Sequence, residues 1–259
     1  MNNSFSNIKT IAPKSFIESV AGSGRGYVTL SYTQDPKTKF LKSECFPASD
    51  RDLILDRAAS LSKKSQVYFG INRRSHSLSI GERGGNGDVG NISIIGMDID
   101  VSDPNEPDKE LPQSQEEALT LLETFTLKPS FTISSGVGVH AYWALNEEIE
   151  ITNDQERKDA QELVRSFYRG FAQFAHPFKF DSTHDLSRML RFPGSWNFKD
   201  PENPRQVVFL SENPERTYSI SEIKGVGITK PTSMPKQPLQ IKPGGMSLTK
   251  VIKGCSWVN

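Results

Sequence analysis

The feature that most restricts the fold of this chain is the run NISIIGMDIDV, residues 91–101, which is rich in isoleucine and methionine up to the point where two aspartates appear. A continuous apolar run of this length, bounded by Gly-rich and Pro-rich segments, predicts a buried strand. Side chains alternate along a strand, so the apolar residues at 95, 97, 99 and 101 share the core face. Asp98 and Asp100 share the opposite face, roughly 6–7 Å apart. The sequence therefore predicts two carboxylates held on one rigid surface.

Other segments supply both strands and helices. Period-2 alternation predicts strands over residues 26–32, 66–72, 130–134 and 139–145. Helical spacing predicts helices over residues 49–61 (capped by Ser49), 116–125 and 153–175. This mixture, with hairpins, predicts an α+β fold. Residues 226–245 are rich in Pro, Gly, Lys and Gln, which predicts a flexible linker, and residues 246–259 begin a new helical pattern.

Composition excludes several classes of protein. The chain has 259 residues, no long apolar run and no apolar segment near its start, so neither a membrane helix nor a secretory signal is expected. Its two cysteines, Cys45 and Cys255, make neither a disulfide framework nor a zinc cluster. We therefore expect a cytoplasmic protein without zinc.

Charge is balanced overall but unevenly distributed. The 31 basic and 31 acidic residues cancel, so the chain lacks the basic excess of many small nucleic-acid binders. Residues 1–97 nevertheless carry 13 basic and 8 acidic side chains, whereas residues 98–128 carry 2 and 9. The acidic stretch begins at the two aspartates.

A second block, SSGVGVH at residues 134–140, follows a predicted strand. Its small residues allow backbone amides to approach an anion closely. His140 points away from the apolar face of the following strand, so it joins the aspartates if the two strands are neighbours. The alternative is a plain hairpin turn with a surface histidine.

A third block spans residues 180–199. Asp181 follows Phe180 and offers a further carboxylate, while Asp185 is placed to cap a helix over residues 186–191. On such a helix Arg188 and Arg191 share one face and can grip phosphates. Pro193-Gly194 predicts a turn, after which Asn197 and Lys199 follow with strand spacing. The alternative is an ordinary capped helix with exposed arginines.

Together and in this order, the three blocks resemble the archaeo-eukaryotic primase superfamily, in particular the primase-polymerase branch of phages, plasmids and mobile elements. The family pattern is an hhhDhD strand, a small-x-His strand and an h-acid element, here IIGMDID, GVH and FD. The run from Arg191 to Lys199 also matches the Arg-x-Pro-Gly-x-x-Asn-x-Lys element of this branch. The resemblance covers residues 13–225 and implies an RNA-recognition-motif-like core sheet packed with a second α/β unit.

The resemblance also implies template-directed nucleotidyl transfer with Mg²⁺ or Mn²⁺, acting on single-stranded or primed DNA with dNTP or NTP substrates. The implied metal ligands are Asp98, Asp100 and Asp181, with Asp185 competing for the third place. The implied nucleotide contacts are Ser134, Ser135, Gly138, His140, Arg188, Arg191, Asn197 and Lys199. The tail 246–259 resembles the helical segment that follows the core in primase-helicases, which implies a longer replication protein with a helicase domain or partner.

Two other functions remain open on the sequence alone. A non-catalytic DNA-binding initiator domain would bind DNA without needing a metal. A metal-dependent nuclease would shorten its substrate without added nucleotides.

Overall fold

The computed structural model describes residues 14–33, 42–180 and 185–226, and it confirms the predicted α+β class. The helices are α1 (Lys14–Ala21), α2 (Arg51–Ser62), α3 (Gln115–Thr124), α4 (Asp154–Phe174) and α5 (Ile220–Val226), with a 3-10 turn η1 (Asn86–Asp88). The strands are β1 (Tyr27–Thr33), β2 (Lys42–Pro47), β3 (Gln66–Gly70), β4 (Arg73–Arg74), β5 (Val89–Ile99), β6 (Phe131–Ser134), β7 (Val139–Glu150), β8 (Met189–Arg191), β9 (Trp196–Asn197), β10 (Arg205–Gln206), β11 (Val208–Glu212) and β12 (Thr217–Tyr218). Within these ranges no helix is long and apolar enough to cross a membrane. The predicted third acid, Asp181, and the tail beyond residue 226 lie outside the described residues.

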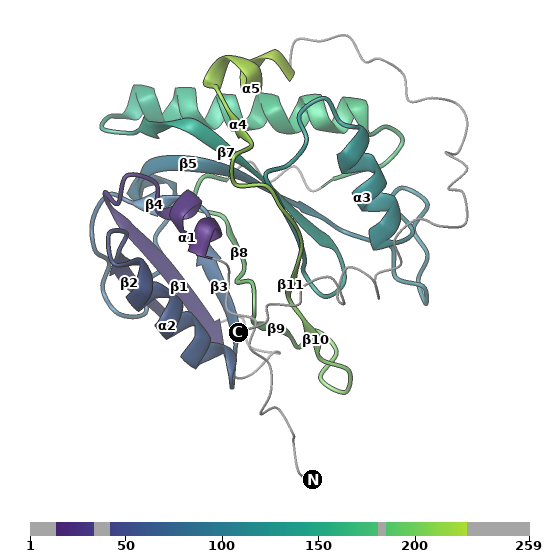
Figure 1. The fold of residues 1–259 in the computed structure, drawn as a ribbon, viewed down its shortest axis with the longest axis horizontal. Helices are drawn as coiled ribbons and strands as arrows, with labels where there is room; N and C mark the ends of the chain where they lie inside the picture. Colours follow the sequence, from purple (N-terminus) through teal and green to yellow (C-terminus); the bar gives the residue numbers. More distant parts are fainter. Residues whose placement is uncertain (1–13, 34–41, 181–184, 227–259) are drawn as a thin grey trace.

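Ten strands form one sheet in the order β11-β6-β7-β5-β4-β1-β3-β8, with β2 added at β1 and β12 at β7. The two-residue strand β4 connects β5 to β1, so the sheet has a β5–β7 half and a β1–β3 half. Figure 1 shows the two halves diverging, with β5 and β7 above and β1 and β3 below. Strands β9 and β10 form a separate pair beside them.

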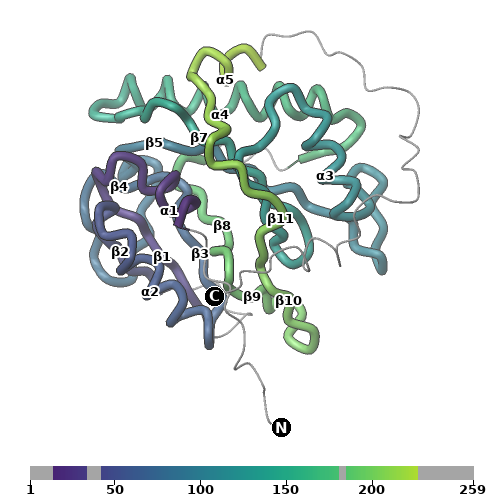
Figure 2. The backbone as a smooth tube through the Cα atoms, in the orientation of Figure 1, coloured from purple at the N-terminus to yellow at the C-terminus, as the bar shows by residue number. Residues whose placement is uncertain are grey.

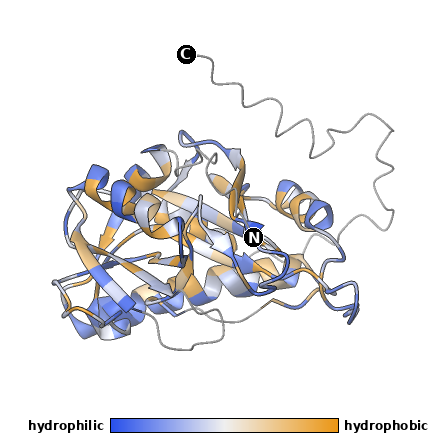
Figure 3. Ribbon diagram, turned by 90° about the horizontal axis from the view of Figure 1, so that it is seen from below, coloured by the Kyte–Doolittle hydropathy of each residue, from blue (hydrophilic) through white to orange (hydrophobic). Residues whose placement is uncertain are grey.

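One hydrophobic core lies between the β5–β7 half and helices α3, α4 and α5. Trp143 of β7 meets Phe167 of α4 edge to face, with ring centroids 4.9 Å apart, and Phe125 contacts Phe171 at the same separation. The apolar stripe that the sequence predicts for the long helix is buried here. Both hydrophobic and hydrophilic residues run along the helices in Figure 3, as one-sided burial requires.

A second core joins the two halves of the sheet. Phe16 of α1 is fully buried and lies edge-on to Phe69 of β3, Phe131 of β6 and Tyr142 of β7, with centroids 5.1–5.6 Å apart. Edge-to-face contacts of this kind add stability beyond the apolar area that they bury. Helix α1 therefore packs against strands of both sheet halves.

The N-terminal caps of two helices can be compared with the capping residues predicted from the sequence. Asn153 caps α4 as predicted, because its side chain accepts hydrogen bonds from the amides of Gln155 and Glu156. The prediction of Ser49 as the cap of the second helix is wrong by one position. Asp50 is the cap, and its carboxylate accepts from the amide of Leu53 at 3.1 Å.

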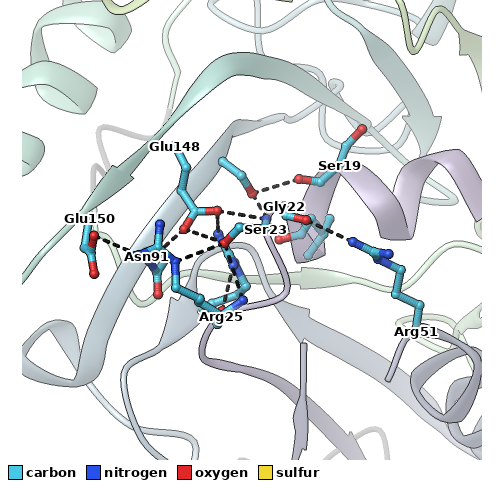
Figure 4. Close-up of polar contacts among 11 residues, drawn as sticks. Ser19, Gly22, Ser23, Arg25, Arg51, Asn91, Glu148 and Glu150 are labelled. Atoms are coloured by element: carbon cyan, nitrogen blue, oxygen red, sulfur yellow. Dashed lines mark hydrogen bonds and ion pairs between the residues drawn. The ribbon is translucent and has the colours of Figure 1, made fainter. Parts of the chain in front are cut away.

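A polar network ties the turn between α1 and β1 to the far end of β7 (Figure 4). The carboxylate of Glu148 accepts hydrogen bonds from the amide of Ser23 at 3.1 Å and from Nδ2 of Asn91 at 2.8 Å. It also forms an ion pair with the fully buried guanidinium of Arg73. Gly22 has a φ of +51°, and a Cβ on it would lie 2.5 Å from Oε2 of Glu148, so this turn favours glycine.

Candidate active site

The two aspartates of the first block stand at the end of β5. Ile95, Met97 and Ile99 are buried in the core beneath the helices, as the alternation predicts. The side chain of Asp98 lies on the other face and is 24% exposed. Asp100 directly follows the strand and is exposed. One carboxylate is thus half-buried and the other is open to solvent.

His140 faces Asp98 across the sheet. Strands β5 and β7 are antiparallel neighbours, and Asp98 and His140 are directly opposite partners, with Nε2 3.6 Å from Oδ1. The imidazole is 1% exposed, and its Nδ1 lies 3.3 Å from the hydroxyl of Tyr142. The expected meeting of the histidine with the first aspartate is confirmed.

The environment of His140 keeps its ring uncharged. Burial lowers the pKa of His140 to about 3, with further lowering by the positive charges of Arg191 and Arg188 and an opposing effect of Asp100. A neutral imidazole has one N–H donor and one acceptor nitrogen. Since Tyr142 offers a hydroxyl to Nδ1, the arrangement allows Nε2 to carry the proton toward Asp98.

Arg188 reaches the same carboxylate from the third block. Its Nη2 is 3.9 Å from Oδ2 of Asp98, and its side chain is 14% exposed. Asp98 therefore has His140 near one oxygen and Arg188 near the other. These three side chains come from blocks that lie about 40 residues apart along the sequence.

The predicted helix over residues 186–191 is wrong. Met189–Arg191 form strand β8, which pairs with β3, and Asp185 closes a turn by accepting from the amide and hydroxyl of Ser187. Figure 2 shows β8 running beside β3, although the two strands are far apart in the sequence. Pairing with β3 outweighs the weak helical pattern, because intrinsic propensity yields to tertiary contacts.

Arg191 consequently does not share a helical face with Arg188. It is opposite Tyr68 in the β3–β8 pair, and its guanidinium carbon lies 5.4 Å from the Tyr68 ring centroid. An arginine over an aromatic face is held by cation–π attraction. The second arginine still influences the site, since its charge lowers the pKa of His140.

The Ser-Ser-Gly turn joins β6 to β7 beside His140. Ser135 accepts a hydrogen bond from the amide of Gly138 at 3.0 Å, and Ser134 accepts from the amide of Gly136 at 3.3 Å. A Cβ on Gly138 would lie 2.4 Å from the carbonyl oxygen of Ile99, so glycine lets the turn approach the end of β5. Both serine oxygens thus shape the turn.

Asn197 supports this turn from β9. It is buried, and its Nδ2 donates to the carbonyl of Ser135 at 2.8 Å. Lys199, two residues on, is exposed, and its amide donates to Oδ1 of Asn197. The structure places Asn197 against the turn and Lys199 at the surface.

Gln115 was missed by the sequence reasoning. Its Nε2 donates to Oγ of Ser134 at 2.9 Å and to the carbonyl of Val137 at 3.0 Å, so the first residue of α3 braces the turn. A glutamine after a helix cap has no local pattern that indicates such a contact. Nothing in the sequence could have found it.

Within the described ranges, no group of three or more His, Cys, Asp or Glu residues is placed to hold a metal ion. Asp98 and Asp100 nevertheless suit Mg²⁺ or Mn²⁺, because these ions commonly take one or two carboxylates and complete their shell with water and substrate phosphate oxygens. Asp185 is engaged by Ser187, and Asp181 is outside the described residues.

Comparisons with known proteins support the fold. No family model matches the chain, and no curated protein does. Among solved structures, primase RepB' matches with a TM-score of 0.50 at 12% identity, covering 82% of this chain and 60% of that one. The primase-polymerase domain of cyanophage S-2L matches with a TM-score of 0.45 at 15% identity, covering 78% of this chain and 89% of that one. The RepB' catalytic domain in complex with initiator DNA matches with a TM-score of 0.48 at 13% identity, covering 83% of this chain and 91% of that one. The chain therefore has the fold of primase RepB'.

Proposed function

We propose that the chain is a DNA primase-polymerase that joins nucleotides to a 3′-hydroxyl on a DNA template with Mg²⁺ or Mn²⁺. The observation that carries the proposal is the meeting of Asp98, His140 and Arg188 where β5 ends and β7 begins. Carboxylates, a neutral histidine and a guanidinium are the groups that metal-assisted phosphoryl transfer uses. The primase fold agrees with this chemistry.

The acids would hold the cations. Asp98 and Asp100 are the first two ligands of the proposal, and Asp181 is the expected third. Bound there, the metal ions would activate the 3′-hydroxyl and stabilise the departing pyrophosphate. The exposure of Asp100 leaves one side of the site open to solvent and to substrate.

The remaining side chains would position the triphosphate. His140 would donate a hydrogen bond from Nε2 to a phosphate oxygen, while Arg188 and Arg191 would offset the charge that develops on the phosphates. The serine turn would approach the phosphates through its backbone, with Asn197 as its support and Lys199 as an outer contact. Catalysis by such a site is mainly positioning and charge stabilisation, so it requires no general base among the protein side chains.

A primer-extension assay tests the proposal. The chain is incubated with a primed single-stranded template, dNTPs or NTPs and Mn²⁺, and Asp98→Asn is compared with Glu150→Gln, an exposed carboxylate at the opposite end of the same half-sheet. We expect extension by the wild type and by Glu150→Gln, and a loss of about 10²–10³-fold in Asp98→Asn.

Three outcomes would contradict the proposal. A folded wild-type chain that neither starts nor extends a primer would refute it. DNA binding that is independent of metal and unchanged in Asp98→Asn, without extension, would indicate a binding module. Shortening of the DNA without added nucleotides would indicate a nuclease.

A further inference from the structure

Arg74 is a buried cation outside the candidate site. It is 0% exposed, and its guanidinium donates to three backbone carbonyls rather than to a carboxylate. Nε donates to the carbonyl of Arg83 at 3.1 Å, Nη1 to that of Asn72 at 3.0 Å, and Nη2 to that of Ser187 at 3.3 Å. Within the described ranges, no ion pair of Arg74 is found. Burial accordingly lowers the pKa of Arg74.

The three carbonyls that accept from Arg74 belong to three different segments of the chain. Arg83 belongs to the Gly-rich loop before β5, Asn72 to the turn between β3 and β4, and Ser187 to the segment that leads into β8. A planar guanidinium with donors at fixed angles can hold such a set of acceptors together. Arg74 therefore links the Gly-rich loop, the β3–β4 turn and the third block.

A glycine of the Gly-rich loop lies close to this guanidinium. A Cβ on Gly84, whose φ is +73°, would lie 3.0 Å from Nε of Arg74 and 2.7 Å from Leu78. The Gly-rich loop, which has no nucleotide-binding signature, thus closes over the arginine.

The segment that leads into β8, whose Ser187 carbonyl accepts from Arg74, also carries Arg188. Ser187 immediately precedes Arg188, whose Nη2 lies 3.9 Å from Asp98. Further contacts fix the same stretch, since Nδ2 of Asn72 donates to the carbonyl of Leu186 and Oδ1 of Asn86 accepts from the amide of Ser187, both at 2.9 Å. Contacts from outside the segment thus position the arginine of the site.

We propose that Arg74 is a positioning residue, which holds the carbonyl of Ser187 so that Arg188 stays directed at the phosphate site beside Asp98. Burying a charge is costly even with the charges of Asp88 and Asp185 acting on it, and an apolar side chain of similar volume would pack at lower cost. An arginine with three carbonyl partners is therefore expected where backbone placement matters. The functional part of the inference rests on the proposed nucleotidyl transfer.

The test compares Arg74→Lys with Arg73→Lys. The two arginines are adjacent in β4 and equally buried, but Arg73 pairs with Glu148 far from Arg188. Lysine keeps the positive charge but lacks the planar guanidinium that donates to several carbonyls at once. Hydrogen–deuterium exchange is measured at the amides of Ser187 and Arg188, which are hydrogen-bonded in the structure. We expect exchange to be about tenfold faster in Arg74→Lys and unchanged in Arg73→Lys.

A kinetic cycle gives the functional readout. In primer extension, Arg74→Lys is expected to raise the KM for the nucleotide about tenfold while the affinity for the template stays unchanged. If Arg74 acts through Arg188, adding Arg74→Lys to Arg188→Ala changes KM by less than about twofold. Arg73→Lys is expected to change the KM in the Arg188→Ala background by the same factor as it does in the wild type.

The outcomes separate this inference from the proposed function. Unchanged exchange in Arg74→Lys overturns it, whatever the activity. Faster exchange with an unchanged KM overturns the positioning role, and so do fully multiplying effects of Arg74→Lys and Arg188→Ala. If exchange is faster in Arg74→Lys but the wild type extends no primer, the proposed function is refuted and, with it, the phosphate role of this segment, while the contact between Arg74 and Ser187 stands.

Discussion

Replacing Glu148 by glutamine is the sharpest test of how the two halves of the sheet are held together. The Arg73 side chain is 0% exposed and that of Glu148 is 12% exposed, and the two form an ion pair. Glutamine keeps the volume of the side chain and removes its charge, so Arg73 stays buried without a compensating anion. Removing one partner of a buried pair costs about 3–5 kcal/mol.

Other contacts of Glu148 support a value in that range. Its carboxylate also accepts from the amide and hydroxyl of Ser23 and from Nδ2 of Asn91 (Figure 4). One glutamine oxygen cannot serve all of these donors, but the amide retains part of the network. We therefore expect Glu148→Gln to lower the free energy of unfolding by about 3 kcal/mol, or the melting temperature by about 6–12 °C.

Urea denaturation with linear extrapolation is the assay, and Glu150→Gln is the matched control. Glu150 lies two residues further along β7 and pairs with Arg25 at 3.0 Å, but the two side chains are 51% and 60% exposed. An exposed pair contributes about 0–1 kcal/mol. If Glu148→Gln and Glu150→Gln differ by less than about 0.5 kcal/mol at equal m-values, the reasoning from burial is refuted.

The pH dependence gives a second check. Burial raises the pKa of Glu148, but hydrogen bonds from the Ser23 amide and from Arg73, with the Arg73 charge, outweigh it, so its pKa is lowered from 4.5. A lowered folded-state pKa stabilises the fold above the unfolded-state pKa, and this stabilisation is lost as the pH falls through the folded value. The stability difference between wild type and Glu148→Gln should therefore narrow below about pH 4.5. A difference that stays constant down to pH 3 would contradict this assignment.

Three further predictions concern the candidate site and the helix starts. Gly138→Ala should weaken nucleotide binding and lower stability by about 2 kcal/mol, measured by titration and urea unfolding, because its Cβ would lie 2.4 Å from the carbonyl of Ile99. Asn197→Ala should raise the nucleotide KM in primer extension and cost about 1–3 kcal/mol in urea unfolding, because the Ser135 carbonyl loses a buried donor. Asp50→Ala should cost about 1 kcal/mol in the same unfolding assay, whereas Ser49→Ala should cost less than about 0.5 kcal/mol. Equal effects of the last two would contradict the observed cap.

The sequence was a sound guide wherever burial is periodic. Alternation along 91–101 and 139–145 puts Asp98 and His140 on faces opposite the helix-covered core, and the structure places them there. Asn153 begins its helix as predicted, because a cap and the apolar stripe after it are local signals. These features depend on neighbours within a few residues along the chain.

Long-range contacts explain what the sequence did not reveal. Residues 189–191 are extended because β3 offers a pairing edge, and a local helical spacing of three residues cannot compete with it. The bonds that place Ser187 and Leu186 come from Arg74 and Asn72, 113 and 114 residues earlier. Such partners leave no local pattern, so only the fold identifies them.

The local charges narrow the choice of ligand more than the net charge does. Asp98 and Asp100 bring two negative charges to the site, Arg188 and Arg191 bring two positive charges, and the buried imidazole of His140 stays neutral between them. An anion bound alone would be repelled by the two carboxylates, and a cation bound alone would be repelled by the two guanidiniums. A metal-bound triphosphate carries both signs and can present its cation to the aspartates and its phosphate oxygens to the arginines. Under the proposed function, this balance supports a metal–nucleotide complex as the ligand over either component alone.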